Sequence, residues 1–286
     1  MLEPIASPRP SVVALAASVL LLGPVLAGCQ REEPAPEAAP SQTQAQTQIQ
    51  APVVSVAPAP TLDRASLLQA MDVAASAYAA GRDLGGADLV GRRFSVRQVF
   101  GCTGPTPPPA GDAVSGGGLA RWAWGDRRRT LKLTLAPGDW TDSALIAGGA
   151  DSWEAVEGFW VTRPWLRTEG CPGVQGDPLA GGSVAPSPQT VGLAAVFDQD
   201  GPRTGRRNGR AYEYVVRGEG DQPPAAPSDG YRLVLEGRMA AFADGRAIRC
   251  RAAGPDQRPV CIGAVRLDRV AFEDASGRLL SEWRGG

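Results

Sequence analysis

The sequence predicts a mainly β fold: an antiparallel β-sandwich or partly open barrel with one packed N-terminal helix. Two observations predict the sheets. Apolar residues alternate with polar ones in several short segments after residue 90, and Asn-Gly or Asp-Gly pairs separate some of these segments. A third observation predicts the helix, because apolar residues recur at helical spacing in one segment near the start of the domain.

The helix is expected within residues 61–81. Thr61 or Asp63 can cap its start, and Gly81 can end it. Residues three and four apart lie on one helical face, so we expect its apolar stripe to pack in the core. The stripe consists of Leu67, Leu68, Met71, Ala74, Ala75 and Tyr78.

Half-buried strands are expected next. In residues 93–100, Phe94, Val96 and Phe100 fall on one face. The other face carries Arg93, Ser95 and Arg97. In residues 130–135, three leucines alternate with Thr and Lys in the same way.

Turn-forming pairs predict two hairpins, because Asn, Asp and Gly tolerate the positive φ angles of a two-residue turn. Asn208-Gly209 lies between the segments 191–197 and 211–216. Asp244-Gly245 lies between the segments 231–242 and 246–250. From Tyr231 to Trp283, the sequence predicts a four-strand antiparallel meander.

Residues 1–28 are predicted to be a signal peptide. One positive residue, Arg9, precedes an apolar run from Val12 to Leu22 that is too short to span a bilayer. Residues 29–60, rich in Pro, Ala, Gln and Thr, are expected to form a disordered tether, and residues 61–286 a single β-rich domain.

The signal ends in four residues, Leu26, Ala27, Gly28 and Cys29, that resemble the lipobox of bacterial lipoproteins. The resemblance implies that the Cys29 thiol receives a diacylglycerol, that the signal is cut just before it, and that the new amino group is acylated. Gln30 stands where an Asp-type inner-membrane retention signal would be, which favours the outer membrane and a domain facing the periplasm. The alternative is an ordinary signal peptide with a chance cysteine.

Four further cysteines in an exported domain predict two disulfides, with three possible connectivities. Cys250 and Cys261 flank a turn-rich segment, so we expect them to bridge neighbouring strands. That pairing leaves Cys102 with Cys171.

Composition excludes several classes of function. The chain has no His, so Ser-His-Asp and Cys-His arrangements and His-ligated zinc or haem sites are impossible, and no cofactor is expected. The 29 basic residues are all Arg except Lys132, and the net charge of −1 makes nucleic acid an unexpected partner. Lys132 lacks a distinctive serine motif for a Ser-Lys dyad. The calcium-loop-like stretch Asp198–Gly201 lacks later acidic ligands, so a turn is expected there.

Four tryptophans are candidate binding residues: Trp122, Trp124, Trp160 and Trp165. They could form a stacking platform for a glycan, or pack in the core as strand aromatics commonly do, which we favour.

Acidic residues in the same region could supply a pair of catalytic carboxylates, although acidic residues are also common on surfaces. They are Asp139, Asp142, Asp151, Glu154 and Glu157.

The sequence therefore predicts a lipid-anchored cell-envelope protein that acts as a non-catalytic binding or assembly module. Its expected partners are the membrane, through the lipid anchor, and an envelope protein or glycan. The alternative is a glycan-binding or glycan-active domain that uses the tryptophan cluster.

Overall fold

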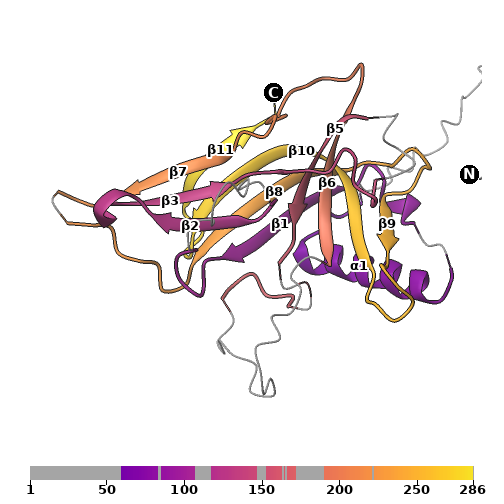
Figure 1. Ribbon diagram of the computed structural model, residues 1–286, viewed down its shortest axis with the longest axis horizontal. Helices are drawn as coiled ribbons and strands as arrows, with labels where there is room; N and C mark the ends of the chain where they lie inside the picture. Colours follow the sequence, from indigo (N-terminus) through magenta and orange to yellow (C-terminus); the bar gives the residue numbers. More distant parts are fainter. Residues whose placement is uncertain are drawn as a thin grey trace, which may run out of the picture. The chain divides into compact units, whose positions relative to one another are not determined.

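The computed structural model describes residues 59–82, 85–106, 117–146, 153–162, 164, 166–171, 190–220 and 222–285. These residues form one α-helix, two short 3-10 helices and eleven strands in two sheets (Figure 1). The fold is mainly β with one helix, as predicted, and the described strands do not close into a barrel. The predicted signal peptide with Cys29, most of the tether, and Trp165 and Asp151 lie outside the described residues.

The helix α1 spans Arg64–Ala79. Asp63 caps it as one of the two predicted candidates, since its carboxylate accepts a hydrogen bond from Ser66 N at 2.8 Å. Gly81, with φ 65°, takes the left-handed conformation that commonly ends a helix. Tyr78, placed by the sequence in the apolar stripe, is 41% exposed. The buried apolar residues of α1 are Leu67, Leu68, Met71, Ala74 and Ala77.

The larger sheet has eight strands in the order β1-β8-β10-β6-β5-β4, with β9 and β11 also paired to β10. Its strands are β1 (Arg93–Phe100), β4 (Gly138–Asp139), β5 (Trp153–Trp160), β6 (Val191–Asp198), β8 (Tyr231–Met239), β9 (Ile248–Arg251), β10 (Val260–Asp274) and β11 (Leu279–Arg284).

The smaller sheet has three strands in the order β2-β3-β7. Its strands are β2 (Ala120–Trp124), β3 (Thr130–Leu135) and β7 (Tyr212–Arg217), and the 3-10 helices are η1 (Ala87–Leu89) and η2 (Asp126–Arg128).

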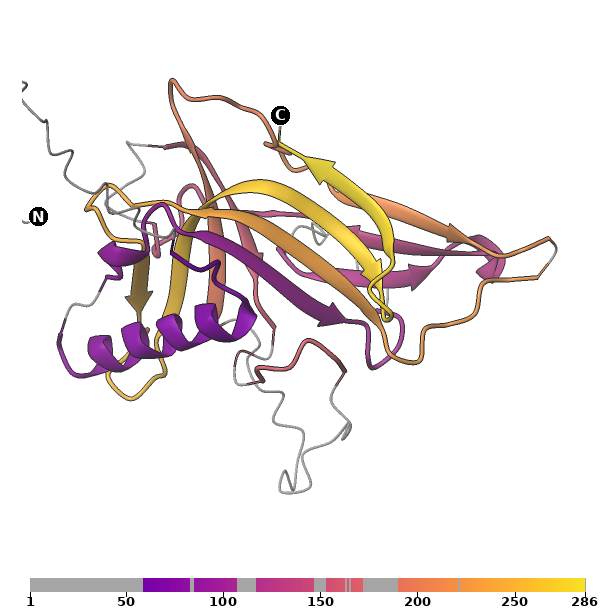
Figure 2. The same cartoon turned by 180° about the vertical axis from the view of Figure 1, so that it is seen from behind.

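The long strand β10 organises the larger sheet. Its first part pairs with β9 and, in parallel, with β6, whereas its second part pairs with β8 and β11. A bulge between Leu267 and Arg269 lies where these partners change. Helix α1 packs beside β9 and the first part of β10, and the smaller sheet lies toward the other end of β10 (Figures 1 and 2).

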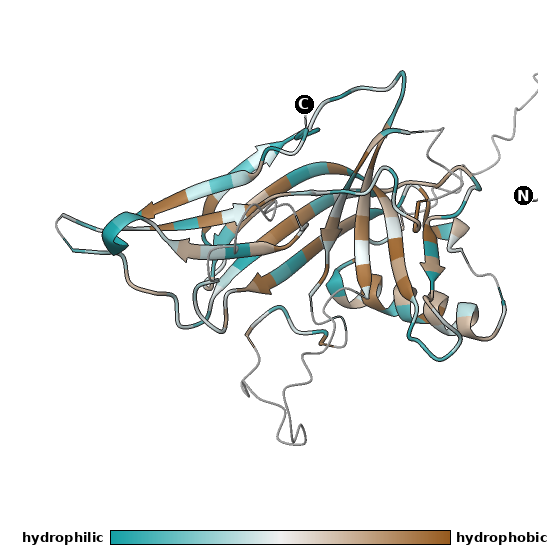
Figure 3. Ribbon diagram, in the orientation of Figure 1, coloured by the Kyte–Doolittle hydropathy of each residue, from teal (hydrophilic) through white to brown (hydrophobic). Residues whose placement is uncertain are grey.

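Two hydrophobic clusters fill the structure. The main one joins α1, the larger sheet and the smaller sheet, and it includes Met71, Trp122 and Phe272. The second includes Trp140 and Phe242 and lies over β5, β6 and the first part of β10. Figure 3 shows the alternation of apolar and polar residues along several strands that lets one face of each strand enter a cluster.

The predicted hairpin at Asn208-Gly209 is wrong. Both residues adopt positive φ angles, 52° and 76°, as such a turn requires. However, β6 and β7 belong to different sheets. The reason lies in β6, where residues 191–196 are all buried: a strand covered on both faces takes an interior position, here between β5 and β10.

The predicted meander from Tyr231 to Trp283 is also wrong in its pairing. The four strands exist, and Gly245 turns the chain with φ 79°. Yet β8 and β9 do not pair with each other; both pair with β10, one after the other along its length. At 15 residues, β10 is long enough to take two successive partners on one edge.

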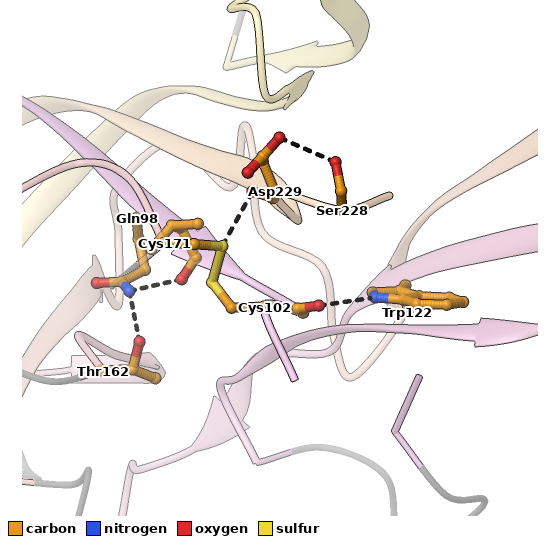
Figure 4. Close-up of a disulfide and its surroundings, with 9 residues drawn as sticks. Gln98, Cys102, Trp122, Thr162, Cys171, Ser228 and Asp229 are labelled. Atoms are coloured by element: carbon orange, nitrogen blue, oxygen red, sulfur yellow. Dashed lines mark hydrogen bonds between the residues drawn. A yellow bond between two sulfur atoms is a disulfide. The ribbon is translucent and has the colours of Figure 1, made fainter. Parts of the chain in front are cut away.

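Both disulfides have the expected pairing. Cys250 and Cys261 lie directly opposite each other on β9 and β10, with Cα atoms 4.0 Å apart. Cys102, just after β1, bonds to Cys171 with Cα atoms 5.6 Å apart (Figure 4).

Among the described residues, no helix has both the length and the apolar character needed to cross a membrane.

Candidate functional site

The three described candidate tryptophans do not share one surface. Trp122 is only 1% exposed in the main cluster, and its Nε1 donates a hydrogen bond to Gly101 O at 3.3 Å (Figure 4). Trp124 is half-buried beside it, with ring centroids 5.7 Å apart. Trp160 packs against the second cluster, 4.5 Å from the ring of Trp140. These rings pack mainly against one another and against core residues, so they form no common stacking platform.

Four of the five predicted carboxylates, by contrast, line one cleft of about 500 Å³, whereas Asp151 lies outside the described residues. It lies between the β4–β5 pair and the segment that leads to β7. The short β4–β5 register sets Asp139 directly opposite Glu157. The cleft is lined by Asp139, Asp142, Glu154 and Glu157, together with Arg206 and Asn208.

Glu157 is a buried carboxylate that holds the Asn-Gly turn. Its Oε1 accepts hydrogen bonds from the backbone N–H groups of Arg207 at 2.7 Å and Asn208 at 2.9 Å. Burial raises the pKa of Glu157, although these hydrogen bonds oppose the shift. Burial also raises the pKa of Tyr212, and the charge of Glu157 adds to that rise.

Glu154 is in the opposite situation. Its carboxylate lies 2.8 Å from the guanidinium of Arg203 and 2.9 Å from that of Arg206. The hydrogen bond from Arg203 is the main cause that holds the pKa of Glu154 below its usual range. The cleft thus combines Glu157, whose carboxyl group retains its proton more readily, with Glu154, whose carboxyl group loses its proton more readily. Opposite shifts of this kind are the electrostatic pattern of an acid and base pair.

The carboxylate of Asp139 accepts hydrogen bonds from the turn that follows it. Its Oδ1 accepts hydrogen bonds from Thr141 N at 3.1 Å and from Thr141 Oγ1 at 2.8 Å. Thr141 Oγ1 in turn accepts a hydrogen bond from Val156 N on β5 at 3.1 Å. This contact fastens the start of the 139–146 segment to the strand that carries Glu157.

The sequence did not indicate the cationic side of the cleft. Arg203, Arg206 and Asn208 follow β6 by a few residues but lie about 50 positions from Glu154 and Glu157, and no local pattern links the two segments. The available signal was the concentration of Arg and Gly around the Asn-Gly pair, which is typical of a loop that can dock onto an acidic group.

Residues Asp198–Gly201, which resemble the start of a calcium loop, form a turn, as expected. Gly201 N donates to Asp198 O at 3.1 Å, and the Asp198 carboxylate forms an ion pair with Arg266. In the described ranges, no group of three or more His, Cys, Asp or Glu residues could hold a metal ion.

Comparison of the chain with protein-family models, with curated proteins and with solved structures finds no match.

Proposed function

We propose that the chain is a lipid-anchored protein of the cell envelope, held in the outer membrane and facing the periplasm, whose β-rich domain is a non-catalytic binding or assembly module. One observation carries the proposal: a short apolar run, Val12 to Leu22, is followed closely by Leu26–Cys29, the pattern that resembles a lipobox. Two or three acyl chains on Cys29 would anchor the chain stably, because each buried methylene contributes about 0.8 kcal/mol.

The segment between Cys29 and the domain suits such an anchor. It is rich in Pro, Ala, Gln and Thr and has few large apolar side chains to bury. At about 3.1 Å per residue where extended, it would let the domain work tens of ångströms from the membrane surface.

The contacts in the carboxylate cleft support binding over catalysis. Glu157 accepts two backbone hydrogen bonds, and Glu154 pairs with two arginines. The contacts of both carboxylates join β5 to the segment that precedes β7, so Glu154 and Glu157 stabilise the wall of the cleft. A reacting substrate would have to compete with those contacts for both carboxylate oxygens of Glu154 and for Oε1 of Glu157.

A glycan-active domain is the second candidate, because Glu154 and Glu157 line one cleft and their pKa values shift in opposite directions. Glu157→Gln separates the two candidates, since the amide oxygen can still accept both backbone hydrogen bonds but the group cannot supply a proton. The proposal predicts that purified wild type and variant release equally few reducing ends from peptidoglycan and polysaccharides. Release by wild type that Glu157→Gln abolishes would favour the second candidate.

Membrane fractionation tests the anchored location. We expect the wild-type chain in the outer membrane, Cys29→Ser released or left unprocessed, and Gln30→Asp moved to the inner membrane. Gln30→Asn is the matched control, because it alters the same position without adding a charge, and it should stay with the wild type. An unchanged distribution of Cys29→Ser would contradict the proposal.

A further inference from the structure

A second cleft, of about 450 Å³, lies at the tip of the smaller sheet. Its walls are the turn that joins β2 to β3 and the segment that follows β7, and Figure 3 shows that turn as hydrophilic. Arg127, Arg129 and Arg217 line it, and none of its described lining residues is acidic. Its volume lies in the range of small-ligand sites.

The three arginines carry uncompensated charge. Within the described part of the chain, their guanidinium groups have no hydrogen-bond or ion-pair partner. Several other cations of the domain are paired; on the same sheet, Lys132 Nζ lies 2.7 Å from Glu213 Oε1. Three like charges around one cleft repel one another, so an anion bound between them would lower the electrostatic energy of the site.

The β2–β3 turn holds its arginines in an uncommon backbone conformation. Arg127 and Arg128 have φ angles of 52° and 59°, in the left-handed region that residues other than Gly, Asn and Asp seldom adopt. The turn is closed by a hydrogen bond from Gly125 N to Thr130 O at 2.9 Å. Arg128 is directed to the ring of Trp124, 6.0 Å from its centroid, while its two neighbours line the cleft. Strain of this kind concentrates at ligand clamps.

The opposite wall is equally constrained. A Cβ on Gly218 would lie 1.8 Å from Gln222 O, so only glycine permits the chain to fold back so closely. Arg217 lies directly opposite Thr130 in the β3–β7 register. Strand pairing therefore fixes the two walls relative to each other. The backbone that carries the three arginines is thus held in place before any ligand binds.

We propose that this cleft, which we call the arginine cleft (Arg127, Arg129 and Arg217), binds a phosphate group that carries more than one negative charge, such as a phosphomonoester or a pyrophosphate. Guanidinium groups match phosphate oxygens with two parallel hydrogen bonds each. A single carboxylate would neutralise only one of the three charges. The inference deepens the proposed binding role, and it rests on the proposed function for its setting at a membrane, where the phosphate could belong to a lipid headgroup or to a soluble ligand.

Isothermal titration calorimetry on the purified mature chain in nonionic micelles tests the site. Inorganic pyrophosphate is the soluble probe, and mixed micelles containing phosphatidic acid present the headgroup, with phosphatidylcholine micelles as the blank. The test variant is Arg127→Gln/Arg129→Gln. The matched control is Arg93→Gln/Arg238→Gln, which removes two exposed arginines that face each other on β1 and β8 and changes the net charge equally.

We expect saturable binding of one or both probes, weakened about tenfold for each arginine removed from the cleft and within about twofold of wild type for the control. Binding of pyrophosphate indicates a soluble ligand, and binding of phosphatidic acid alone indicates a lipid headgroup; either supports the proposal. Equal weakening in both double variants would show diffuse attraction and overturn it. No binding of either probe at millimolar concentration would also overturn it.

This outcome is separable from the fate of the proposed function. The titration concerns the described domain, whereas the lipid anchor concerns the N-terminus. A chain that is lipidated but does not bind phosphate contradicts only the arginine cleft.

Discussion

Trp122 joins the two sheets through a single ring. It lies on β2, in the smaller sheet, yet its Nε1 donates to Gly101 O, directly after β1 of the larger sheet. Gly101 must lack a side chain for this approach, because a Cβ there would lie 2.3 Å from Trp122 Cδ1. Packing and the indole hydrogen bond therefore act together at this position.

Replacing Trp122 by Ala should lower the free energy of unfolding by about 3–5 kcal/mol, since the cavity would open in the main cluster. Trp124→Ala is the matched control and should cost less, because that ring is already half-buried. Urea unfolding of the two variants measures the difference. Equal losses, or a nearly unchanged Trp122→Ala, would show that Trp122 is not a core residue.

Glu157 should make stability depend on pH in a defined direction. Burial raises its pKa in the folded state above the usual 4.5, so the folded chain binds this proton more tightly than the unfolded chain does. Its contribution to stability is therefore complete below about pH 4.5 and is lost as the pH rises through the folded-state pKa.

Glu157→Gln keeps an oxygen for the two backbone hydrogen bonds and never ionises. The stability of wild type relative to this variant should accordingly fall as the pH rises from about 4 to about 8. Urea unfolding across that range measures the two curves. A difference that stays constant, or that grows with pH, would mean that burial does not dominate the pKa of Glu157.

The packing of Trp140 against β5 and β6 depends on a glycine in each strand. A Cβ on Gly158 of β5 would lie 1.9 Å from Trp140 Cδ2, and one on Gly192 of β6 would lie 2.7 Å from Cη2. The ring occupies the space that two side chains would otherwise take. The second cluster is thereby brought directly onto the backbone of the sheet.

Gly158→Ala should destabilise the protein by about 1–3 kcal/mol, because the added methyl group overpacks a filled cluster. Gly170→Ala is the control, since a Cβ there meets no atom within 4 Å and its φ is not in the left-handed region. Thermal unfolding of both variants gives the comparison. Similar melting temperatures for the two would contradict the packing described around Trp140.

Local sequence patterns predicted the positions of the helix and strands better than they predicted which strands pair with each other. Alternation placed strands over 93–100 and 130–135 with the observed bounds, and helical spacing located α1. The turns at Asn208-Gly209 and Asp244-Gly245 also formed, but without hairpins. A turn sequence constrains a few φ and ψ angles, whereas the partner of a strand is set by burial on both its faces and by distant segments such as β10.

The same limit applied to the sites. Trp160 lies in a more continuously apolar segment than Trp122, a pattern that favours burial of Trp160. The structure places Trp160 at the end of β5, half-buried, and Trp122 inside β2, opposite Leu133. The carboxylates of the cleft were foreseen as a group because they are close in sequence, but the arginine cleft was missed, since Arg217 joins the Arg127–Arg129 run only through the β3–β7 pairing.

For the whole molecule, the disulfides fasten the β domain at two separate places. Cys250–Cys261 links β9 to β10, and Cys102–Cys171 links the end of β1 to the segment after β5. The latter closes a loop with a sequence separation of 69, which by chain entropy contributes about 4 kcal/mol, against about 3 kcal/mol for the separation of 11. Bonds of this kind persist in the oxidising compartment that the proposed export would provide.

The proposed function depends on a lipid attached to Cys29. Mass spectrometry of the N-terminal peptide of the mature chain, purified from membranes, detects that lipid. We expect a peptide that begins at Cys29 and bears a diacylglycerol on the thiol and an acyl group on the new amino group. An unmodified peptide, or one that begins at another residue, would show that the chain is not anchored through Cys29.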